Sequence, residues 1–186
     1  MRFWQTIRRD FCHHIDSPFY TDPKRVTFLR ILRAFIEPEF RIVFAYRVYR
    51  HLFSNGHKIL SYLIYVRTKA VTRCDIAREA EIGAGFKIAH PFDVVIGPDA
   101  RLGDDVIVFN GVTIGNRLSK DFWTGMPVIG NAVLIGTGSK ILGPVKIGDG
   151  ARIGANAVVL CDVPQGATAV GNPARIIDPR QAAGAK

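Results

Sequence analysis

One histidine lies apart from the others in this sequence. His90, within the segment IGAGFKIAHPFDVVIG (82–97), is the only His after His57 in a chain of 186 residues. Imidazole titrates near neutral pH, so a histidine can act as a general base or acid in catalysis. The alternative is a ring that only packs against, or caps, the turn formed with Pro91. No clustered His, Cys and Asp spacing accompanies it, so the sequence predicts no metal site.

The segment around His90 belongs to a six-residue repeat. An aliphatic residue recurs at this period thirteen times, and in eight cases the next residue is Gly. An α-helix does not tolerate so many glycines, and a simple alternating strand has no period of six. The pattern therefore predicts a β-solenoid whose aliphatic residues point inward and whose coils contain three hexads. The aliphatic positions are Ile76, Ile82, Ile88, Ile96, Leu102, Val108, Ile114, Ile129, Ile135, Ile141, Ile147, Ile153 and Val159.

The repeat is interrupted twice. A slip of two residues falls at His90-Pro91, and the segment NRLSKDFWTGMP (116–127) fits no hexad. That segment must leave the solenoid as a loop, and loops on a rigid scaffold commonly carry recognition.

The hexads, together with the closing segment VPQGATAVGNPARII, resemble the hexapeptide-repeat acyltransferases. Within that family the chain looks most like the serine acetyltransferases and the relatives that acetylate extracellular polysaccharides, over roughly residues 28–178. The resemblance implies a mainly β fold, a left-handed parallel β-helix with an N-terminal α-helical region. It also implies an O-acetyltransferase that uses acetyl-CoA and no metal. The left hand comes from the family alone, since it opposes the usual crossover rule.

The resemblance also implies the catalytic pair. Serine acetyltransferases pair a catalytic His with an Asp of a preceding coil, and Asp75 precedes His90 at the same separation as in that pair. His90 would take the proton of the acceptor hydroxyl, and Asp75 would orient the ring and stabilise the imidazolium. Because the acceptor supplies the nucleophile, no enzyme Ser or Cys is required.

In the family, coenzyme A lies in a cleft between neighbouring subunits. Two arginines could pair with its phosphates, although each could equally be solvated. The residues that the resemblance assigns to coenzyme A are Asn116, Thr137, Gly138, Arg152, Ala155 and Arg175.

The chain departs from the serine acetyltransferases where they hold the charged groups of the amino acid. The family has Asp immediately before the catalytic His, Glu shortly after it, and an Arg-His pair before the Pro that re-enters the repeat. This chain has Ala89, Pro98 and Gly125-Met126 instead. A zwitterionic acceptor would lose charge-assisted hydrogen bonds on leaving water.

We therefore expect a neutral hydroxyl acceptor, a saccharide, contacted by Ala89, Trp123 and Met126. L-serine is the alternative acceptor, and a non-catalytic trimeric scaffold is the alternative of another class. Trp123 could equally anchor its loop on a neighbouring subunit.

The N-terminal part has a different composition. Residues 1–75 contain 14 Lys and Arg against 6 Asp and Glu, a net charge of +8, while residues 76–186 contain 11 against 10, a net charge of +1. Apolar residues recur at helical spacing over 22–36, 39–53 and 57–71. These helices are expected to pack on the solenoid or on a sister subunit. An anionic membrane is the open alternative, and nucleic acid is not an expected partner.

We divide the chain into a basic α-helical region (1–73), a hexapeptide-repeat β-helix (74–177) and a C-terminal tail (178–186). No signal peptide is recognised, and the longest apolar run, ILSYLIYV, is too short to span a bilayer. The odd number of cysteines matches no CxxC pattern, as expected of a reducing compartment. We expect a cytoplasmic homotrimer or dimer of trimers, with peripheral contact at the inner membrane face left open.

Overall fold

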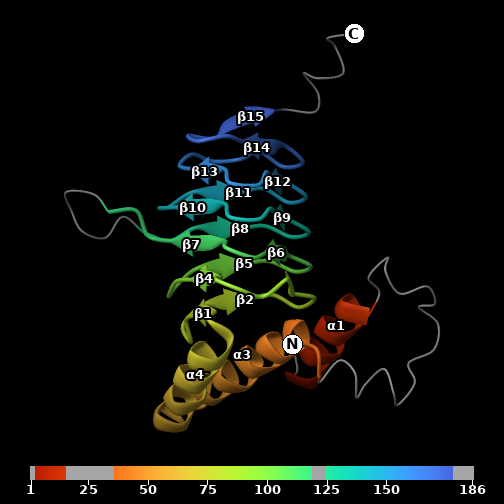
Figure 1. The fold of residues 1–186 in the computed structure, drawn as a ribbon, viewed down its shortest axis with the longest axis vertical. Coiled ribbons are helices and arrows are strands. Elements are labelled where there is room, and N and C mark those ends of the chain that lie inside the picture. Colours follow the sequence, from red (N-terminus) through yellow and green to blue (C-terminus); the bar gives the residue numbers. More distant parts are fainter. Residues whose placement is uncertain (1–2, 16–35, 119–124, 178–186) are drawn as a thin grey trace.

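The computed structural model describes residues 3–15, 36–118 and 125–177, where three helices precede a solenoid of short strands (Figure 1). The helices of these ranges are α1 (Phe3–Ile15), α3 (Pro38–Ser54) and α4 (Lys58–Thr72). The helices expected over 39–53 and 57–71 are present as α3 and α4. The helix expected over 22–36 lies outside the described residues except at its last position, and the sequence patterns did not predict α1.

The solenoid has three faces, each a stack of strands from successive coils. Face A contains β1 (Asp75–Ile76), β4 (Val95–Ile96), β7 (Thr113–Gly115), β10 (Lys140–Leu142) and β13 (Val158–Val159). Face B contains β2 (Glu81–Ile82), β5 (Arg101–Leu102), β8 (Val128–Ile129) and β11 (Lys146–Ile147). Face C contains β3 (Lys87–Ala89), β6 (Ile107–Phe109), β9 (Leu134–Ile135), β12 (Arg152–Ile153), β14 (Thr168–Val170) and the antiparallel β15 (Arg175–Ile177).

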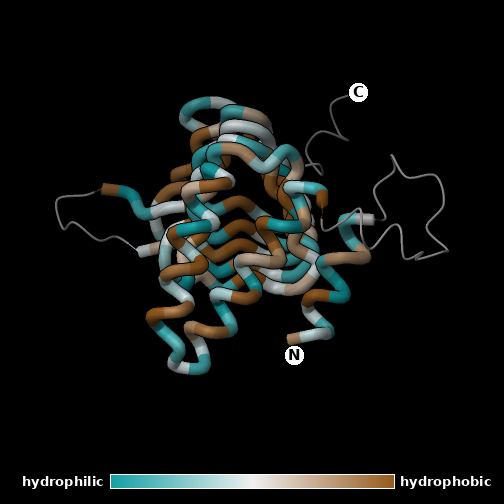
Figure 2. The backbone as a smooth tube through the Cα atoms, turned by 60° about the horizontal axis from the view of Figure 1, so that its bottom comes forward, coloured by the Kyte–Doolittle hydropathy of each residue, from teal (hydrophilic) through white to brown (hydrophobic). Residues whose placement is uncertain are grey.

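The thirteen aliphatic residues of the repeat form the core of the solenoid. Each of the strands β1 to β13 contains one of them, and none is more than 9% exposed. Figure 2, turned toward the helical end, shows apolar segments in brown repeated through successive coils. The predicted β-solenoid is confirmed, because a period of six gives every coil the same three inward positions.

The first coil is longer than the next one. Asp75 pairs with Val95 on the next coil, and Val95 pairs with Thr113 on the coil after that. More residues separate Asp75 from Val95 than separate Val95 from Thr113. The difference corresponds to the two-residue slip at His90-Pro91, which accordingly lies between β3 and β4.

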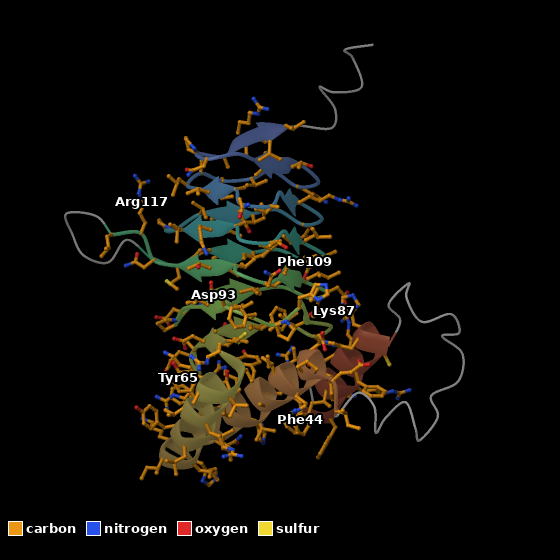
Figure 3. The ribbon with its side chains drawn as sticks, viewed as in Figure 1. Phe44, Tyr65, Lys87, Asp93, Phe109 and Arg117 are labelled. Atoms are coloured by element: carbon orange, nitrogen blue, oxygen red, sulfur yellow. The ribbon has the colours of Figure 1, made fainter. Side chains whose placement is uncertain are left out.

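The second interruption lengthens a coil further. The step from Thr113 to its partner Lys140 is longer than either earlier step, and the extra residues lie between β7 and β8, where the sequence predicts the loop 116–127; residues 119–124 of that loop lie outside the described residues. Arg117 projects from the solenoid near the start of this loop (Figure 3).

Glycine after the aliphatic residue permits close approach of the coils. A Cβ atom added to Gly83 would lie 2.5 Å from the carbonyl carbon and oxygen of Gly103 on the next coil. A side chain there would force the two coils apart, so the glycine that follows Ile82 is required by packing.

Helix α3 covers the first coil at the lower end of the solenoid (Figure 1). Ile42, Val43, Tyr46 and Tyr49 are buried and belong to the same apolar cluster as the solenoid core. The hydroxyl of Tyr46 donates to the carbonyl of Ala80 at 2.8 Å, and the hydroxyl of Tyr49 donates to that of Ile76 at 2.7 Å. The expected packing of the helical region on the solenoid is observed.

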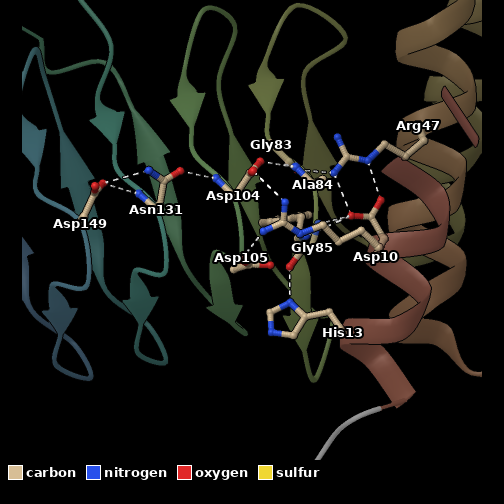
Figure 4. Close-up of polar contacts among 12 residues, drawn as sticks. Asp10, His13, Arg47, Gly83, Ala84, Gly85, Asp104, Asp105, Asn131 and Asp149 are labelled. Atoms are coloured by element: carbon tan, nitrogen blue, oxygen red, sulfur yellow. Dashed lines mark hydrogen bonds and ion pairs between the residues drawn. The ribbon is translucent and has the colours of Figure 1, made fainter. Parts of the chain in front are cut away.

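A buried ion pair joins α1 and α3 to the first coil (Figure 4). Arg47 of α3 donates to both carboxylate oxygens of Asp10 of α1, at 2.8 and 3.1 Å, and these side chains are 7% and 1% exposed. They also bond to four backbone groups of the first coil, the carbonyl oxygens of Ile82 and Gly83 and the N–H groups of Gly85 and Phe86. Asp10 allows the charge of Arg47 to be buried, because the two side chains form an ion pair.

Candidate active site

His90 lies on an exposed corner between face C and face A. It follows Ala89, whose Cα pairs with that of Phe109 on the next coil, and it has a φ of +55°. Asp93 has the same positive φ, so the connection between β3 and β4 contains two left-handed residues. His and Asp tolerate this conformation better than most side chains. The slip thereby directs His90 outward, and its side chain is classed as exposed.

Corner residues of later coils stack beside His90. The N–H of Gly111 donates to the carbonyl of Phe92 at 2.9 Å, and the N–H of Gly138 donates to the carbonyl of Asn110 at 2.8 Å. The hydroxyl of Thr137 reaches the side-chain oxygen of Asn110 at 3.2 Å. The N–H of Asn156 donates to the carbonyl of Thr137 at 2.8 Å in turn. A column of small and polar groups therefore extends from the His90 corner through the later coils; we call it the His90 column, and Thr137, Gly138 and Ala155 belong to it.

The other residues assigned to coenzyme A are more dispersed. Arg175 pairs with Val170, whose side chain lies beside Gly154, so Arg175 is close to the upper end of the His90 column. Arg152 lies at the opposite end of face C, where its Cα pairs with those of Leu134 and Thr168. Asn116 follows β7 on face A. Arg152 and Asn116 are therefore not brought to this column within one chain.

The carboxylate of Asp75 is bonded to helix α4. The hydroxyl of Tyr65 donates to Oδ1 and the ammonium of Lys69 to Oδ2, each at 2.5 Å. Burial and then the adjacent carboxylate raise the pKa of Tyr65, and the hydrogen bond with Asp75 raises the pKa of Lys69. Both groups thus remain protonated donors. Among the hydrogen bonds of the described residues there is none between Asp75 and His90, so the pairing that the family resemblance implies is not formed as a hydrogen bond in this structure.

The predicted acceptor residues differ in their surroundings. Ala89 is half-buried beside Phe109, and Met126 packs on the solenoid core with its methyl group next to Gly97. Trp123 lies outside the described residues. Gly125 has a φ of +104°, and a Cβ added there would lie 3.2 Å from Cβ of Pro144. An arginine at this position would be strained in the observed backbone.

Sequence patterns missed three residues around the candidate pair. Tyr65 and Lys69 contact Asp75, and Phe92 is 63% exposed shortly after His90. The i, i+4 spacing of Tyr65 and Lys69 places them on one helix face, but nothing in the sequence indicated that this face meets Asp75. Within the described ranges no three His, Cys, Asp or Glu side chains lie together in a metal-binding group.

Comparison with known proteins links this geometry to one family. The family described as Bacterial transferase hexapeptide (six repeats) matches residues 126–161. Serine acetyltransferase of Mycobacterium tuberculosis is 39% identical over 166 residues, which are 86% of this chain and 69% of the relative. Serine acetyltransferase of Helicobacter pylori is 34% identical over 168 residues, 90% of this chain and 96% of the relative.

Solved structures give the same result. The serine acetyltransferase of Neisseria gonorrhoeae in complex with serine aligns with a TM-score of 0.80 at 31% identity, covering 95% of this chain and 69% of the other. A serine acetyltransferase in complex with CoA aligns with a TM-score of 0.78 at 29% identity, covering 94% and 69%.

Proposed function

Because this chain belongs to the serine acetyltransferase family of hexapeptide-repeat acyltransferases, we propose that it transfers acetyl from acetyl-CoA to the hydroxyl of L-serine. The protein is an acyltransferase, and the identity of 34–39% with serine acetyltransferases over most of the chain carries the proposal. The uncharged residues Ala89, Pro98 and Gly125-Met126 predict a saccharide acceptor. The relatives support its alternative, serine, better.

The chemistry assigned to His90 is proton transfer at two stages. Its ring nitrogen accepts the hydroxyl proton as the oxygen attacks the thioester carbonyl. The tetrahedral intermediate collapses, the C–S bond breaks, and the imidazolium returns the proton to the sulfur. The products are an O-acetyl ester and the free thiol of coenzyme A. Asp75 would orient the ring and stabilise the imidazolium between these stages.

The His90 column is the proposed binding site of acetyl-CoA. Small residues such as Gly138 and Ala155 leave room for a pantetheine arm beside the backbone. Arg175, near the upper end of the column, could pair with a phosphate. Arg152 and Asn116 would contribute only across a contact between subunits. The relative with bound CoA supports this choice of ligand.

A second candidate acceptor is a neutral hydroxyl compound such as a saccharide. The observation that favours it is the backbone at Gly125, where φ of +104° and the nearby Pro144 oppose the arginine that serine acetyltransferases have there. Met126 is packed on the core and brings no charge. A site that lacks charged partners has little means of selecting a zwitterion over a neutral alcohol.

Steady-state kinetics with L-serine and a panel of saccharides, followed by mass spectrometry of the products, tests the two acceptors. For serine we expect a kcat/KM of about 10⁴ M⁻¹s⁻¹ or more, the ordinary enzyme range. Met126→His, which restores an imidazole while leaving Gly125 in place, should raise kcat/KM for serine and leave saccharide turnover unchanged, and Met126→Leu is the matched control. Turnover of saccharides with negligible acetylation of serine would refute the serine proposal.

We also propose that the protein is a homotrimer and that it is cytoplasmic. None of the described helices is long and apolar enough to cross a bilayer. Helix α4 presents an exposed apolar surface, each member at least 42% exposed, which another subunit would cover: Ile59, Leu60, Tyr62, Leu63, Val66 and Val71. The basic residues of the same helix leave contact with an anionic membrane as the competing explanation.

Sedimentation at micromolar concentration should give a trimer or a larger assembly, and Leu63→Asp should weaken it. Binding to vesicles containing phosphatidylserine should be weak and unaffected by that change. If the wild type sediments as an active monomer, the trimer is wrong. If Leu63→Asp abolishes vesicle binding and leaves the assembly intact, the α4 surface contacts lipid instead.

A further inference from the structure

Two side chains of helix α4 hold the carboxylate of Asp75, and neither belongs to the repeat. Tyr65 binds one carboxylate oxygen and Lys69 the other, each at 2.5 Å. The two donors are one helical turn apart, so both face the start of the first coil. Figure 3 shows Tyr65 at the junction of α4 with the solenoid. Asp75 thus has a fixed orientation before any substrate or second subunit is present.

The donors differ in rigidity. The ring of Tyr65 packs edge-on against that of the buried Tyr49, with centroids 5.8 Å apart at 74°. Helix α4 is itself tied to α3 by the buried hydroxyl of Ser61, which donates to the carbonyl of Tyr49 at 2.7 Å. Lys69 is about half exposed, and its ammonium forms the ion pair with Asp75. Tyr65 therefore fixes the position of the carboxylate, while Lys69 places a positive charge beside it.

Asp75 and His90 belong to the same corner of the solenoid. Asp75 opens the first coil on face A, and His90 ends that coil in the connection that leads to β4. The paired strand β4, which follows His90 closely, places Val95 next to Asp75. A carboxylate has about four lone-pair positions, so the two bonds from α4 leave acceptor capacity for an imidazole N–H.

We propose that Tyr65 and Lys69 are positioning residues for acetyl transfer, which fix the Asp75 carboxylate at the His90 corner and moderate the negative charge that it presents to the imidazole. This inference rests on the proposed role of His90 as the base. A carboxylate near an imidazole stabilises the imidazolium, and a cation bonded to that carboxylate offsets part of the effect. Removal of Lys69 should therefore make His90 a stronger base.

Variants of helix α4 test the proposal. Lys69→Met should move the acid limb of the kcat/KM profile to higher pH by about half a unit, because the carboxylate is no longer offset. Lys69→Arg should retain the wild-type profile. Tyr65→Phe should lower kcat roughly tenfold with KM for acetyl-CoA unchanged, as losses of supporting hydrogen bonds commonly do. Lys58→Met, at an exposed position of α4, is the matched control for charge.

A purely structural role predicts a different pattern. Lys69→Met and Tyr65→Phe would then lower the melting temperature and leave both the acid limb and kcat of the folded enzyme at wild-type values, which would overturn the proposal. A shift of the acid limb of equal size in Lys58→Met would also overturn it, because the effect would then not require a cation bonded to Asp75.

A second readout separates this inference from the proposed function. The His90 ring resonance can be identified among the five histidines by its loss in His90→Gln. Its titration midpoint should rise in Lys69→Met even if the wild type acetylates neither serine nor any saccharide, a result that would refute the proposed function alone. If the midpoint is the same in both proteins, the positioning role is refuted whatever the acceptor.

Discussion

Replacement of His90 by alanine should lower kcat by about 10²–10⁴-fold, the usual contribution of a general base. Binding of acetyl-CoA, measured by calorimetry, should change little, because the ring lies at one end of the His90 column rather than along it. His90 is exposed and outside the core, so folding should be retained.

Asp75→Asn should reduce kcat less than His90→Ala does, because Asp75 orients the base and does not transfer the proton. Asparagine has the same shape and can still accept the hydrogen bond from Tyr65, which limits structural damage. Near-normal turnover in His90→Ala would show that the base has been misassigned.

The largest expected loss of stability comes from the buried pair of Asp10 and Arg47. Asp10→Ala leaves the guanidinium buried without its carboxylate, and removal of one member of a buried pair typically costs about 3–5 kcal/mol of unfolding free energy. It also leaves two backbone N–H groups of the first coil without their acceptor (Figure 4). Urea unfolding followed by circular dichroism, at fixed protein concentration, measures the change.

Two further variants make this prediction specific. Arg9 is next to Asp10 in the sequence and forms ion pairs with Asp104 and Asp105 on the exposed surface. Arg9→Ala removes these ion pairs and should shift the unfolding midpoint little. The double variant Asp10→Leu with Arg47→Met removes both charges and should recover much of the loss. If Asp10→Ala is no more damaging than Arg9→Ala, the pair does not hold α1 and α3 to the first coil.

The repeat could be predicted from the sequence because its requirements apply within each six-residue unit. An inward position every six residues needs an aliphatic side chain, and close approach of the coils needs a glycine, as at Gly83. Helices α3 and α4 could be predicted for the same reason, since the helical spacing of apolar residues is a property of a short segment. Helix α1 was not predicted, because seven of its thirteen residues are polar or charged. Asp10, which binds α1 to α3 through Arg47, is charged, and a charged residue is expected to be exposed unless its partner is known.

The candidate site shows the same distinction between what the sequence predicted and what depended on tertiary structure. His90 could be picked out from the sequence because it interrupts the repeat, and the resemblance supplied its partner Asp75. Only the tertiary structure showed that both oxygens of Asp75 are bonded to α4, that Arg152 and Asn116 lie away from the His90 column, and that Gly125 has a left-handed backbone. Each of these facts depends on how different elements of the fold are placed relative to one another or on a single backbone angle. A six-residue period determines which side chains point inward, but it carries no information about which helix face meets a given corner of the solenoid.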